Sequence, residues 1–425
     1  MIRRIIDLSA LFHLGTSFVL LIAALIQALT FVLLARGLGP DSFGRLMVIQ
    51  ASAQLALEVV SVGAGEALIR QVSRDRRRHS EALGHALIVT FVTGISLATG
   101  LSALGGFLFH APVKFTAIAI FMIGELIGNR LGTIAEQDFI GHSKVGIANV
   151  VRIILVVPKL VAIYLCTQGF GSVSLSVWII VQGFTTFSAG LACLMFAVVC
   201  LGNPTISFLP DNLRFGALIT VTHLARSVQF NADRIALSIV AAPPLVAVYS
   251  AATRGIQFAL IPIVAILRNQ FAAYFAAGTS GLCTTWKLGL SNLPKVIIIG
   301  VFTGGALIAG ADVFAKILGP GFSGMVSILR WLSAVAILQG IQYLVADVLT
   351  GAEYQFWRTT ISLGGAIGYI ILITGCVLSY GISGLIAAIY LNQIVMIICY
   401  LTTIYFLTRR ERNLVASQST SSVIQ

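Results

Sequence analysis

Long apolar runs, separated by short polar or Pro/Gly-containing breaks, follow one another along most of the chain. Each run has about 20 residues or more, enough for a helix to cross the roughly 30 Å hydrocarbon core of a bilayer. Runs such as Val296–Ala309 and Ile382–Leu407 do not alternate in polarity, so they do not fit the strands of a membrane β-barrel. The pattern predicts twelve membrane-spanning helices, at residues 9–34, 43–69, 83–109, 112–134, 145–167, 172–201, 212–240, 245–276, 293–318, 325–350, 359–380 and 382–408.

The loops between these spans differ in charge from one side to the other. With the N-terminus in the cytoplasm, the inner side receives most basic residues, including Arg3, Arg4 and the Arg74–Arg78 segment, and the outer side very few. This asymmetry is the positive-inside bias of membrane proteins. It predicts a multi-pass protein of a bacterial cytoplasmic (inner) membrane with both termini in the cytoplasm, which requires an even number of spans.

A similar turn recurs between spans one and two (Leu38–Gly44) and between spans seven and eight (Pro243-Pro244). The recurrence suggests two six-helix halves of parallel topology. We expect an N-terminal lobe at residues 1–205, a C-terminal lobe at 206–412 and a Ser-rich, disordered cytoplasmic tail at 413–425.

Composition supports a membrane protein and narrows the chemistry. Only 10% of the 425 residues are charged and 58% are hydrophobic, whereas soluble domains carry about 25% charged residues. Topology explains most of the net charge of +12, and the Arg74–Arg78 segment fits a membrane-surface anchor better than a nucleic-acid patch. The six cysteines have no metal or redox spacing, so we expect neither a metal nor a cofactor. No P-loop occurs, so ATP is not the direct energy source.

Charged residues inside the predicted spans are the most informative feature. A charge at the centre of a membrane helix costs about 2.5–3.5 kcal/mol, so such residues usually face a hydrated cavity or one another. Cations dominate this set, which favours a polyanionic ligand such as a diphosphate. The basic members are Arg130, Arg152, Lys159, Arg226, Arg234, Arg254, Arg268 and Arg330, and the acidic ones Glu58, Glu125, Asp233 and Asp347.

Spacing places several polar residues on common helical faces. Gln50, Gln54, Glu58 and Ser61 recur at steps of four, four and three, so they form one stripe that lines a hydrated path. Arg152 and Lys159 are seven residues apart and also share a face.

Span seven has a comparable face with His223, Arg226 and Asp233, and Arg234 is adjacent to it. Two interpretations stay open for Asp233: a functional group in the cavity, or a structural ion pair with Arg226 or Arg234. Arg254 in span eight, like Lys159 in span five, has no acid on its own helical face, which favours a ligand role.

Three segments give the chain a family resemblance. They are Leu33–Gly44 followed by Gly63–Arg70, Asn231–Leu237 followed by Ala247–Arg254, and Leu318–Pro320 through Leu349–Gly351. In this order and spacing the chain resembles the polysaccharide-transporter (O-antigen flippase) branch of the multidrug/oligosaccharidyl-lipid/polysaccharide exporter superfamily. The turn at Pro243-Pro244 departs from the family, which commonly has a Gly-containing turn there.

The resemblance implies an all-α fold of two six-helix lobes around a central cavity, lined by spans one, two, seven and eight and opened alternately to each side. It carries a functional expectation onto Asp233, Arg234 and Arg254, and more loosely onto Glu58. The expected partners are a polyprenyl-diphosphate-linked oligosaccharide, the lipid bilayer, and glycan polymerase and assembly proteins, with no nucleic acid.

Together these observations predict a flippase for a lipid-linked oligosaccharide. The expected substrate ligands are Arg226, Arg234, Arg254, Lys159, Arg152, Gln50 and Gln54, and the expected ion-coupling residues Asp233 and Glu58. Three alternatives remain: a multidrug exporter of the same superfamily, a membrane polymerase or ligase, and a non-transporting scaffold of a polysaccharide assembly system. The enzyme alternative is disfavoured because no exported loop exceeds about ten residues, whereas such enzymes generally have a large extracytoplasmic loop.

Overall fold

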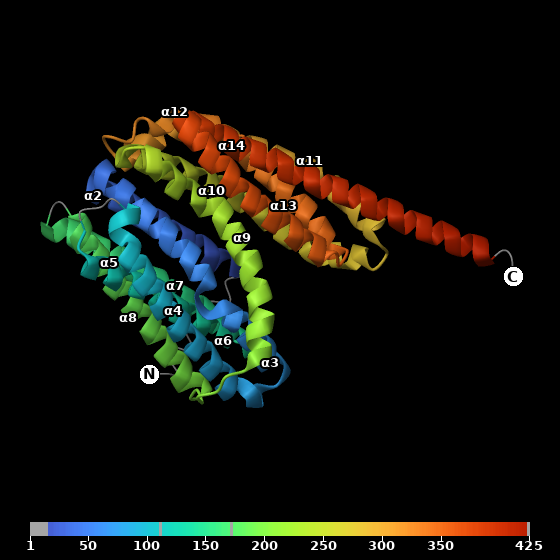
Figure 1. Cartoon of the computed structure of the whole chain (residues 1–425), viewed down its shortest axis with the longest axis horizontal. Coiled ribbons are helices and arrows are strands. Elements are labelled where there is room, and N and C mark those ends of the chain that lie inside the picture. Colours follow the sequence, from blue (N-terminus) through green and yellow to red (C-terminus); the bar gives the residue numbers. More distant parts are fainter. Residues whose placement is uncertain (1–15, 110–112, 171–172, 423–425) are drawn as a thin grey trace. The chain divides into compact units, whose positions relative to one another are not determined.

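The computed structural model describes residues 16–109, 113–170 and 173–422, and every regular element in these ranges is a helix (Figure 1). Arg3, Arg4 and the beginning of the first predicted span lie outside the described residues. The elements are α2 (Thr16–Val59), η1 (Val60–Gly63), α3 (Ala64–Arg74), η2 (Arg76–Arg78), α4 (His79–Phe109), α5 (Phe115–Met122), η3 (Ile123–Gly128), α6 (Asn129–Gly141), α7 (Val145–Phe170), α8 (Leu175–Leu201), α9 (Pro210–Val240), α10 (Pro243–Gly278), α11 (Leu282–Leu318), α12 (Met325–Leu332), α13 (Val335–Gly351) and α14 (Gln355–Ser422).

Twelve membrane-length segments can be followed in this part of the chain. Nine helical stretches are long and apolar enough to cross a membrane. Two of them, Phe18–Arg74 and Gln355–Glu411, have 57 residues each, about 85 Å of helix, so each contains two spans. The helix α9 is long enough for a further span but is not among the nine. The all-α, twelve-helix prediction is confirmed.

Glycines divide the two long stretches. Gly39 has φ 70° and ψ 166° inside α2, and Gly381 has φ 57° and ψ −134° inside α14. These left-handed conformations are readily adopted only by glycine, so the chain can turn there without a longer loop. Pro40 follows directly and suits the first position of a new helix.

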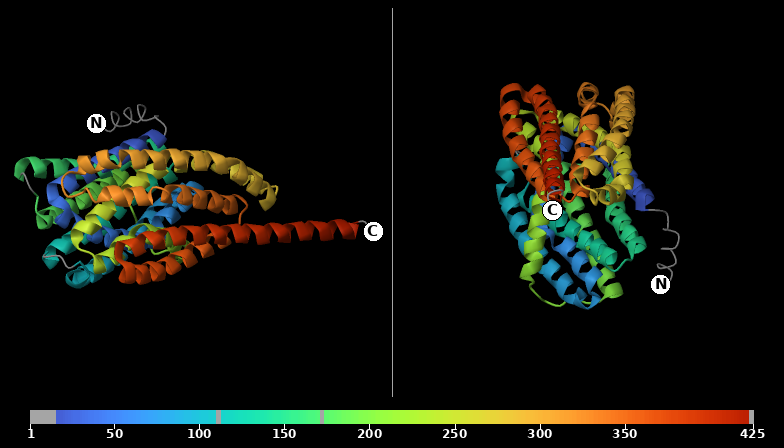
Figure 2. Two further views of the ribbon diagram at one scale, coloured as in Figure 1. Left: turned by 90° about the horizontal axis from the view of Figure 1, so that it is seen from above. Right: turned by 90° about the vertical axis from the view of Figure 1, so that its right-hand side faces the viewer.

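Two helix ends differ from the sequence prediction. The helix α11 begins at Leu282, eleven residues before the expected start of span nine. The last helix, α14, continues to Ser422, through most of the tail for which the sequence suggests disorder, and extends past α11 and α13 (Figures 1 and 2). The polar segment after Arg409 contains neither Gly nor Pro, so no residue in it stops the helix.

The contacts divide the chain into two compact units. Unit 1 comprises Met1–Ile235 with Ala242–Ala247, and unit 2 comprises Ala236–Ala241 with Val248–Gln425. Most of α9, which the sequence analysis assigns to the C-terminal lobe, is therefore grouped with unit 1. The expected lobe boundary at residues 205 and 206 stays a prediction.

Close backbone contact explains why α9 belongs to unit 1. A Cβ atom on Gly63 would lie 2.4 Å from the carbonyl oxygen of Gly216 in α9, and one on Gly216 would lie 2.1 Å from that of Val62. A second contact joins Gly44 to the start of α10, where a Cβ would lie 1.9 Å from the carbonyl oxygen of Pro243. Small residues allow this approach, as is usual between membrane helices.

Unit 2 is held together in the same way and by a polar contact at one helix end. A Cβ on Gly278 would lie 1.9 Å from the carbonyl oxygen of Gly351, so α10 and α13 meet with no side chain between them. The Glu411 carboxylate accepts hydrogen bonds from the Tyr354 hydroxyl, at 2.9 Å, and from the Leu282 backbone N–H, at 3.1 Å. Glu411 therefore ties α14 to the beginning of α11.

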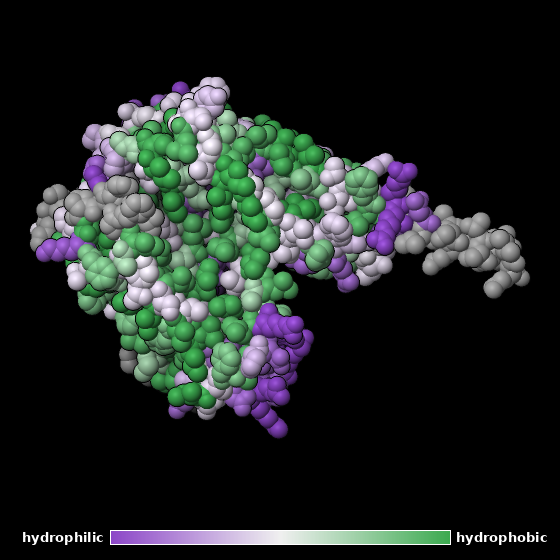
Figure 3. Space-filling model, in the orientation of Figure 1, coloured by the Kyte–Doolittle hydropathy of each residue, from purple (hydrophilic) through white to green (hydrophobic). Residues whose placement is uncertain are grey.

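Side chains on the outside of both units are those of a membrane protein. Hydrophobic residues cover most of the visible helix flanks, and hydrophilic ones gather near helix ends, such as the corner where α3 ends (Figure 3). That corner holds Arg76–Arg78, none of which is buried. The distribution fits helices surrounded by lipid along their flanks and by water at their ends.

Candidate functional site

The second membrane span is broken in its middle. Ser61, Val62 and Gly63 have φ values of 69°, 45° and 65°, so three consecutive residues are left-handed between α2 and α3. This conformation is unfavourable for Ser and most of all for β-branched Val. Such a break at membrane depth persists only where protein or a water-filled cavity surrounds it, and in transporters broken helices commonly form substrate and ion sites.

Polar groups from other helices of unit 1 satisfy the backbone at this break. The Ser61 N–H donates to Thr93 Oγ1 at 3.1 Å, and the guanidinium of the buried Arg130 donates to the carbonyl oxygen of Leu57. The break is therefore built into the packing of α2, α4 and α6, and Arg130 has a structural contact there.

Carboxylates flank the break on both sides. Glu58 precedes it, and its Oε2 lies 4.0 Å from Nδ1 of His223 in α9. Glu66 follows it and accepts a hydrogen bond from Gln137 Nε2 at 3.0 Å. Glu58, an expected ion-coupling residue, thus lies beside an irregular backbone and a titratable His.

A second irregular helix lies in the same unit. The span α5–η3–α6 contains a π-helical segment, Ile123–Gly128, and Glu125 lies inside it. A π-bulge adds a residue to the helical turn, and such bulges occur frequently at functional sites. The Glu125 side chain is only 5% exposed, so a carboxylate is placed in the interior of the bundle.

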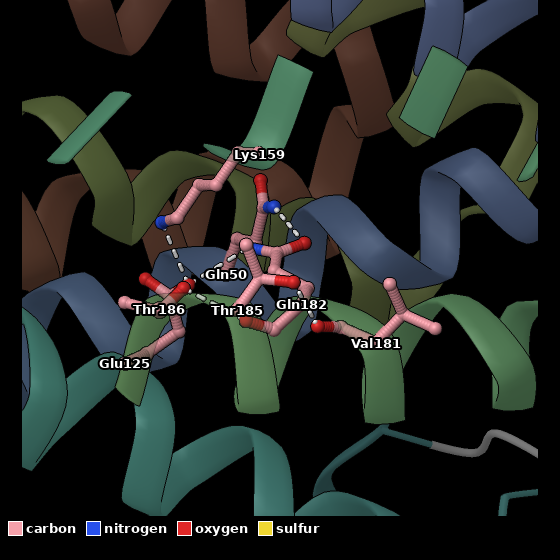
Figure 4. Close-up of polar contacts among 7 residues, drawn as sticks. All are labelled: Gln50, Glu125, Lys159, Val181, Gln182, Thr185 and Thr186. Atoms are coloured by element: carbon pink, nitrogen blue, oxygen red, sulfur yellow. Dashed lines mark hydrogen bonds and ion pairs between the residues drawn. The ribbon is translucent and has the colours of Figure 1, made fainter. Parts of the chain in front are cut away.

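Glu125 is the centre of a polar cluster that joins four spans (Figure 4). Its Oε1 accepts hydrogen bonds from Lys159 Nζ in α7 at 2.8 Å, and from Gln182 Nε2 and Thr186 Oγ1 in α8 at 2.9 Å each. Gln50 Nε2 in α2 donates to Gln182 Oε1 at 3.3 Å. Lys159 and Gln50, both expected substrate ligands, are thus brought together around a buried acid.

The ion pair changes the interpretation of Lys159. No acid lies on the same face of its own helix, but Glu125 on a different span forms an ion pair with the Lys159 ammonium group at 2.8 Å. The Lys159 side chain remains 23% exposed. An anionic ligand at Lys159 would therefore have to compete with Glu125, and the role of Lys159 as a substrate ligand stays a prediction.

Glycines let the π-helical segment approach α8 closely enough to form this cluster. A Cβ on Gly190 would lie 1.8 Å from the carbonyl oxygen of Gly128, and one on Gly124 would lie 2.2 Å from that of Gly183. All these obstructing atoms are backbone, so the space cannot be opened by moving a side chain.

Gly190→Ala is therefore expected to destabilise the protein by about 3 kcal/mol, the upper part of the range for overpacking. The matched control is Gly100→Ala, since no atom lies within 4 Å of its added Cβ. The control should be neutral or stabilise by up to about 1 kcal/mol. Thermal unfolding of both purified variants in detergent measures the difference, and equal midpoints would refute this packing.

The other predicted substrate ligands of unit 1, and the predicted ion-coupling residue Asp233, lie in different surroundings. Arg152 forms an ion pair with Glu136. Gln54 is half-buried in α2. In α9, Asp233 is buried and its Oδ1 accepts a hydrogen bond from the Arg234 N–H at 2.8 Å, while Arg234 Nη1 lies 3.4 Å from Asn231 Oδ1.

The remaining predicted ligands are Arg226 and Arg254. Arg226 is exposed on α9, on the same face as His223. Arg254 lies in unit 2, where its Nη1 donates to Gln257 Oε1 at 2.9 Å, one turn further along α10. The expected convergence of Arg226, Arg234 and Arg254 stays a prediction.

Sequence reasoning missed the central position of Glu125. The signal was a lone acid in a long apolar run, between Phe115 and Gly128. The break at Ser61–Gly63 was missed because Ser and Val rarely adopt left-handed backbone. Neither feature follows from residue spacing alone, since both depend on which helices pack together.

Comparison with known proteins decides the family. The family model described as polysaccharide biosynthesis protein matches residues 14–269, more than half of the chain. The chain belongs to this family. The resemblance stated from the sequence is thereby confirmed. No curated protein matches the chain.

Solved structures with the same fold are transporters. One, the inward-facing conformation of a multidrug resistance MATE family transporter of the MOP superfamily, matches with a TM-score of 0.73 and 15% identity, over 91% of this chain and 96% of that one. The outward-facing conformation of such a transporter matches with a TM-score of 0.64 and 16% identity, over 92% and 95%.

A third structure is a MOP superfamily transporter from Pyrococcus furiosus, described as having a binding pocket of reverse polarity that suggests a different function. It matches with a TM-score of 0.63 and 16% identity, over 92% of this chain and 95% of that one. At such identities the likeness shows the fold alone. Family and fold together identify this polysaccharide biosynthesis protein as a multi-pass membrane transporter, and at that coarse level they support a protein that is not an enzyme.

Proposed function

We propose that this transporter is a flippase that moves a polyprenyl-diphosphate-linked oligosaccharide across the bacterial cytoplasmic membrane, with both termini in the cytoplasm. The sugar-diphosphate headgroup binds to Arg226, Arg234 and Arg254, with Gln50 and Gln54 along its path, while the polyprenyl tail remains in lipid. Movement proceeds by alternating access, as the inward-facing and outward-facing structures of the multidrug relatives suggest.

The observation that carries this proposal is that α9 has the length of a membrane span but is too polar to face lipid. At 31 residues it is long enough to cross the bilayer, about 46 Å, yet it is not among the nine apolar candidate spans. A helix of this polarity is stable at membrane depth only against protein or water. Its polar residues are those expected of a hydrated binding surface.

The charge of α9 and α10 favours an anionic cargo. From Pro210 to Gly278 the sequence contains five arginines and two aspartates. Guanidinium groups match the geometry of phosphate oxygens with two parallel hydrogen bonds. A pocket for cationic drugs would instead need an acidic excess, so the multidrug alternative is the weaker one.

Membership of a polysaccharide biosynthesis family supports a glycan as the cargo. Glycan polymerase and assembly proteins are the partners that such a flippase would need, because the translocated unit must be consumed on the outer side. A scaffold without transport is less consistent with a transporter fold.

We assign ion coupling to Glu58 and Asp233. Glu58 lies beside the broken backbone at Ser61–Gly63, where carbonyl groups leave the regular helical hydrogen-bond pattern. In transporters such carbonyls and an adjacent carboxylate form sites for Na⁺ or H⁺. Asp233 is buried in α9 next to Arg234.

The proposal is tested by reconstituting the purified full-length protein into liposomes that contain a fluorescently labelled lipid-linked oligosaccharide. A membrane-impermeant reagent that modifies the label initially reaches only the outer-leaflet half. We expect the protected fraction to fall with time when a proton or sodium gradient is imposed. Ethidium uptake is measured in the same liposomes. Ethidium transport without movement of the glycan lipid would favour the multidrug alternative and refute the proposal.

A further inference from the structure

Three side chains from two neighbouring corners of unit 1 meet in one small space. His79 is the first residue of α4, Asp138 lies in the last turn of α6, and His142 follows α6. Nε2 of His79 lies 2.9 Å from Oδ2 of Asp138, and Nδ1 of His142 lies 3.3 Å from Oδ1. One nitrogen from each ring and one carboxylate oxygen all lie within 4.8 Å of one another.

Asp138 is the unusual member of this group. Its side chain is 0% exposed, and none of the residues that the structure describes donates a hydrogen bond to its Oδ1. The neighbouring Nδ1 of His142 instead lies 3.0 Å from the backbone carbonyl oxygen of Asp138. Apart from this ring nitrogen at 3.3 Å, the buried Oδ1 has no hydrogen bond among the described residues, and a cation between Oδ1 and the two rings would stabilise it.

We propose that His79, Asp138 and His142 form a binding site for a divalent transition-metal ion, with zinc as its ordinary occupant. Zinc binds His nitrogen and Asp oxygen at about 2.0–2.2 Å, which places tetrahedral ligand atoms about 3.3–3.5 Å apart. The distance of 3.3 Å between His142 Nδ1 and Asp138 Oδ1 already matches this spacing. The fourth position is left for water.

The donor set also selects the class of metal. Magnesium and calcium are bound mostly by oxygen atoms, and six or more ligands are usual. Two imidazoles and one carboxylate suit zinc and the neighbouring ions cobalt, nickel and copper. Such an ion binds only to a ring nitrogen that carries no proton, so its binding competes with protonation of the coordinating nitrogens of both His rings.

The nearby arginines do not prevent a metal cation from binding at this site. Arg76–Arg78 precede His79, but none of them is buried, so water and salt screen their charges. The Asp138 carboxylate is buried and in direct contact with both rings, where solvent and salt screen its charge much less.

The sequence alone did not indicate a metal, because the ligands are far apart in the chain: His79 precedes Asp138 by 59 residues. The fold brings the two corners together. An ion bound there links the corner before α4 to the corner between α6 and α7, and so stabilises unit 1. None of the three ligands belongs to the Glu125 cluster or to the predicted substrate ligands.

The test is a titration of the full-length protein, purified through an affinity tag without histidine, with CoCl₂ as a spectroscopic substitute for zinc. We expect one Co²⁺ per chain, with visible absorption bands of a four- or five-coordinate site that disappear when ZnCl₂ is added. Saturating zinc should raise the midpoint of thermal unfolding by several degrees, because a ligand that binds only the folded state stabilises it.

Variants locate the site. His142→Gln and Asp138→Asn should each weaken cobalt binding by about ten-fold or more, whereas His223→Gln, at another His beside a carboxylate, should leave it unchanged. His142 is the most exposed of the three ligands, at 12%, so His142→Gln is expected to fold, which gel filtration checks. Absence of stoichiometric binding, or equal binding by wild type and His142→Gln, would overturn the proposal.

Discussion

Glu125→Gln should lower the stability of the protein by about 3 kcal/mol, and adding Lys159→Met to it should restore most of the loss. Removing one partner of a buried ion pair leaves the other charge uncompensated, which costs about 3–5 kcal/mol. The lower end applies because Lys159 is 23% exposed. Replacing both charges removes the ammonium as well, so the double variant should lie within about 1 kcal/mol of the wild type.

Thermal unfolding in detergent measures this effect. For a protein unit of about 150–250 residues, 3 kcal/mol corresponds to a midpoint lowered by roughly 6–12 °C. The matched control is Asp41→Asn, which removes one partner of the exposed pair between Asp41 and Arg45. It should change stability by less than about 1 kcal/mol. A Glu125→Gln variant as stable as wild type, or a double variant less stable than Glu125→Gln alone, would contradict the role of Glu125 as the centre of the cluster.

Arg254→Ala should slow movement of the lipid-linked oligosaccharide by ten-fold or more without changing expression or thermal stability. A hydrogen bond to a charged group contributes about 1.5–3 kcal/mol, equivalent to roughly 10- to 150-fold in rate or affinity. The initial rate of label modification in proteoliposomes gives the comparison.

Arg268→Ala is the matched control on the same helix. Arg268 is exposed, nearer the end of α10, and is not among the predicted ligands. Its replacement should change the rate by less than about two-fold. Arg254→Lys should fall between wild type and Arg254→Ala, because lysine keeps the charge but lacks the planar fork of donors. If Arg254→Ala and Arg268→Ala slowed transport equally, the rate would depend on the overall positive charge of α10 and not on a specific contact of Arg254.

The sequence was sufficient for the number and order of the spans because length and apolarity directly decide whether a helix can cross a bilayer. It also located the turns near Gly39 and Gly381, where glycine and proline interrupt the apolar runs. The ends of α11 and α14 were less accessible. Both helices continue into polar sequence, where apolarity no longer indicates the boundary.

The candidate site could be predicted only in part. The sequence singled out Gln50 and Lys159 as polar residues within the spans, and both are half-buried in the structure, while their roles as substrate ligands stay predictions. It did not predict that they meet around Glu125, because Lys159 is 34 residues from Glu125 and on a different span. The same limit applies to His79, Asp138 and His142. Contacts between helices depend on packing. Here the packing depends on close backbone contacts between helices, such as that of Gly190 in α8 with Gly128 in the π-helical segment.

A comparison of two substrates tests the central claim that an anionic lipid-linked glycan is the cargo. Proteoliposomes of the wild-type protein are loaded with the same labelled oligosaccharide joined to polyprenol either through a diphosphate or through a neutral linkage. We expect the diphosphate-linked lipid to move at least ten-fold faster than the neutral one. Equal initial rates for the two lipids, or no movement of either above protein-free liposomes, would contradict it.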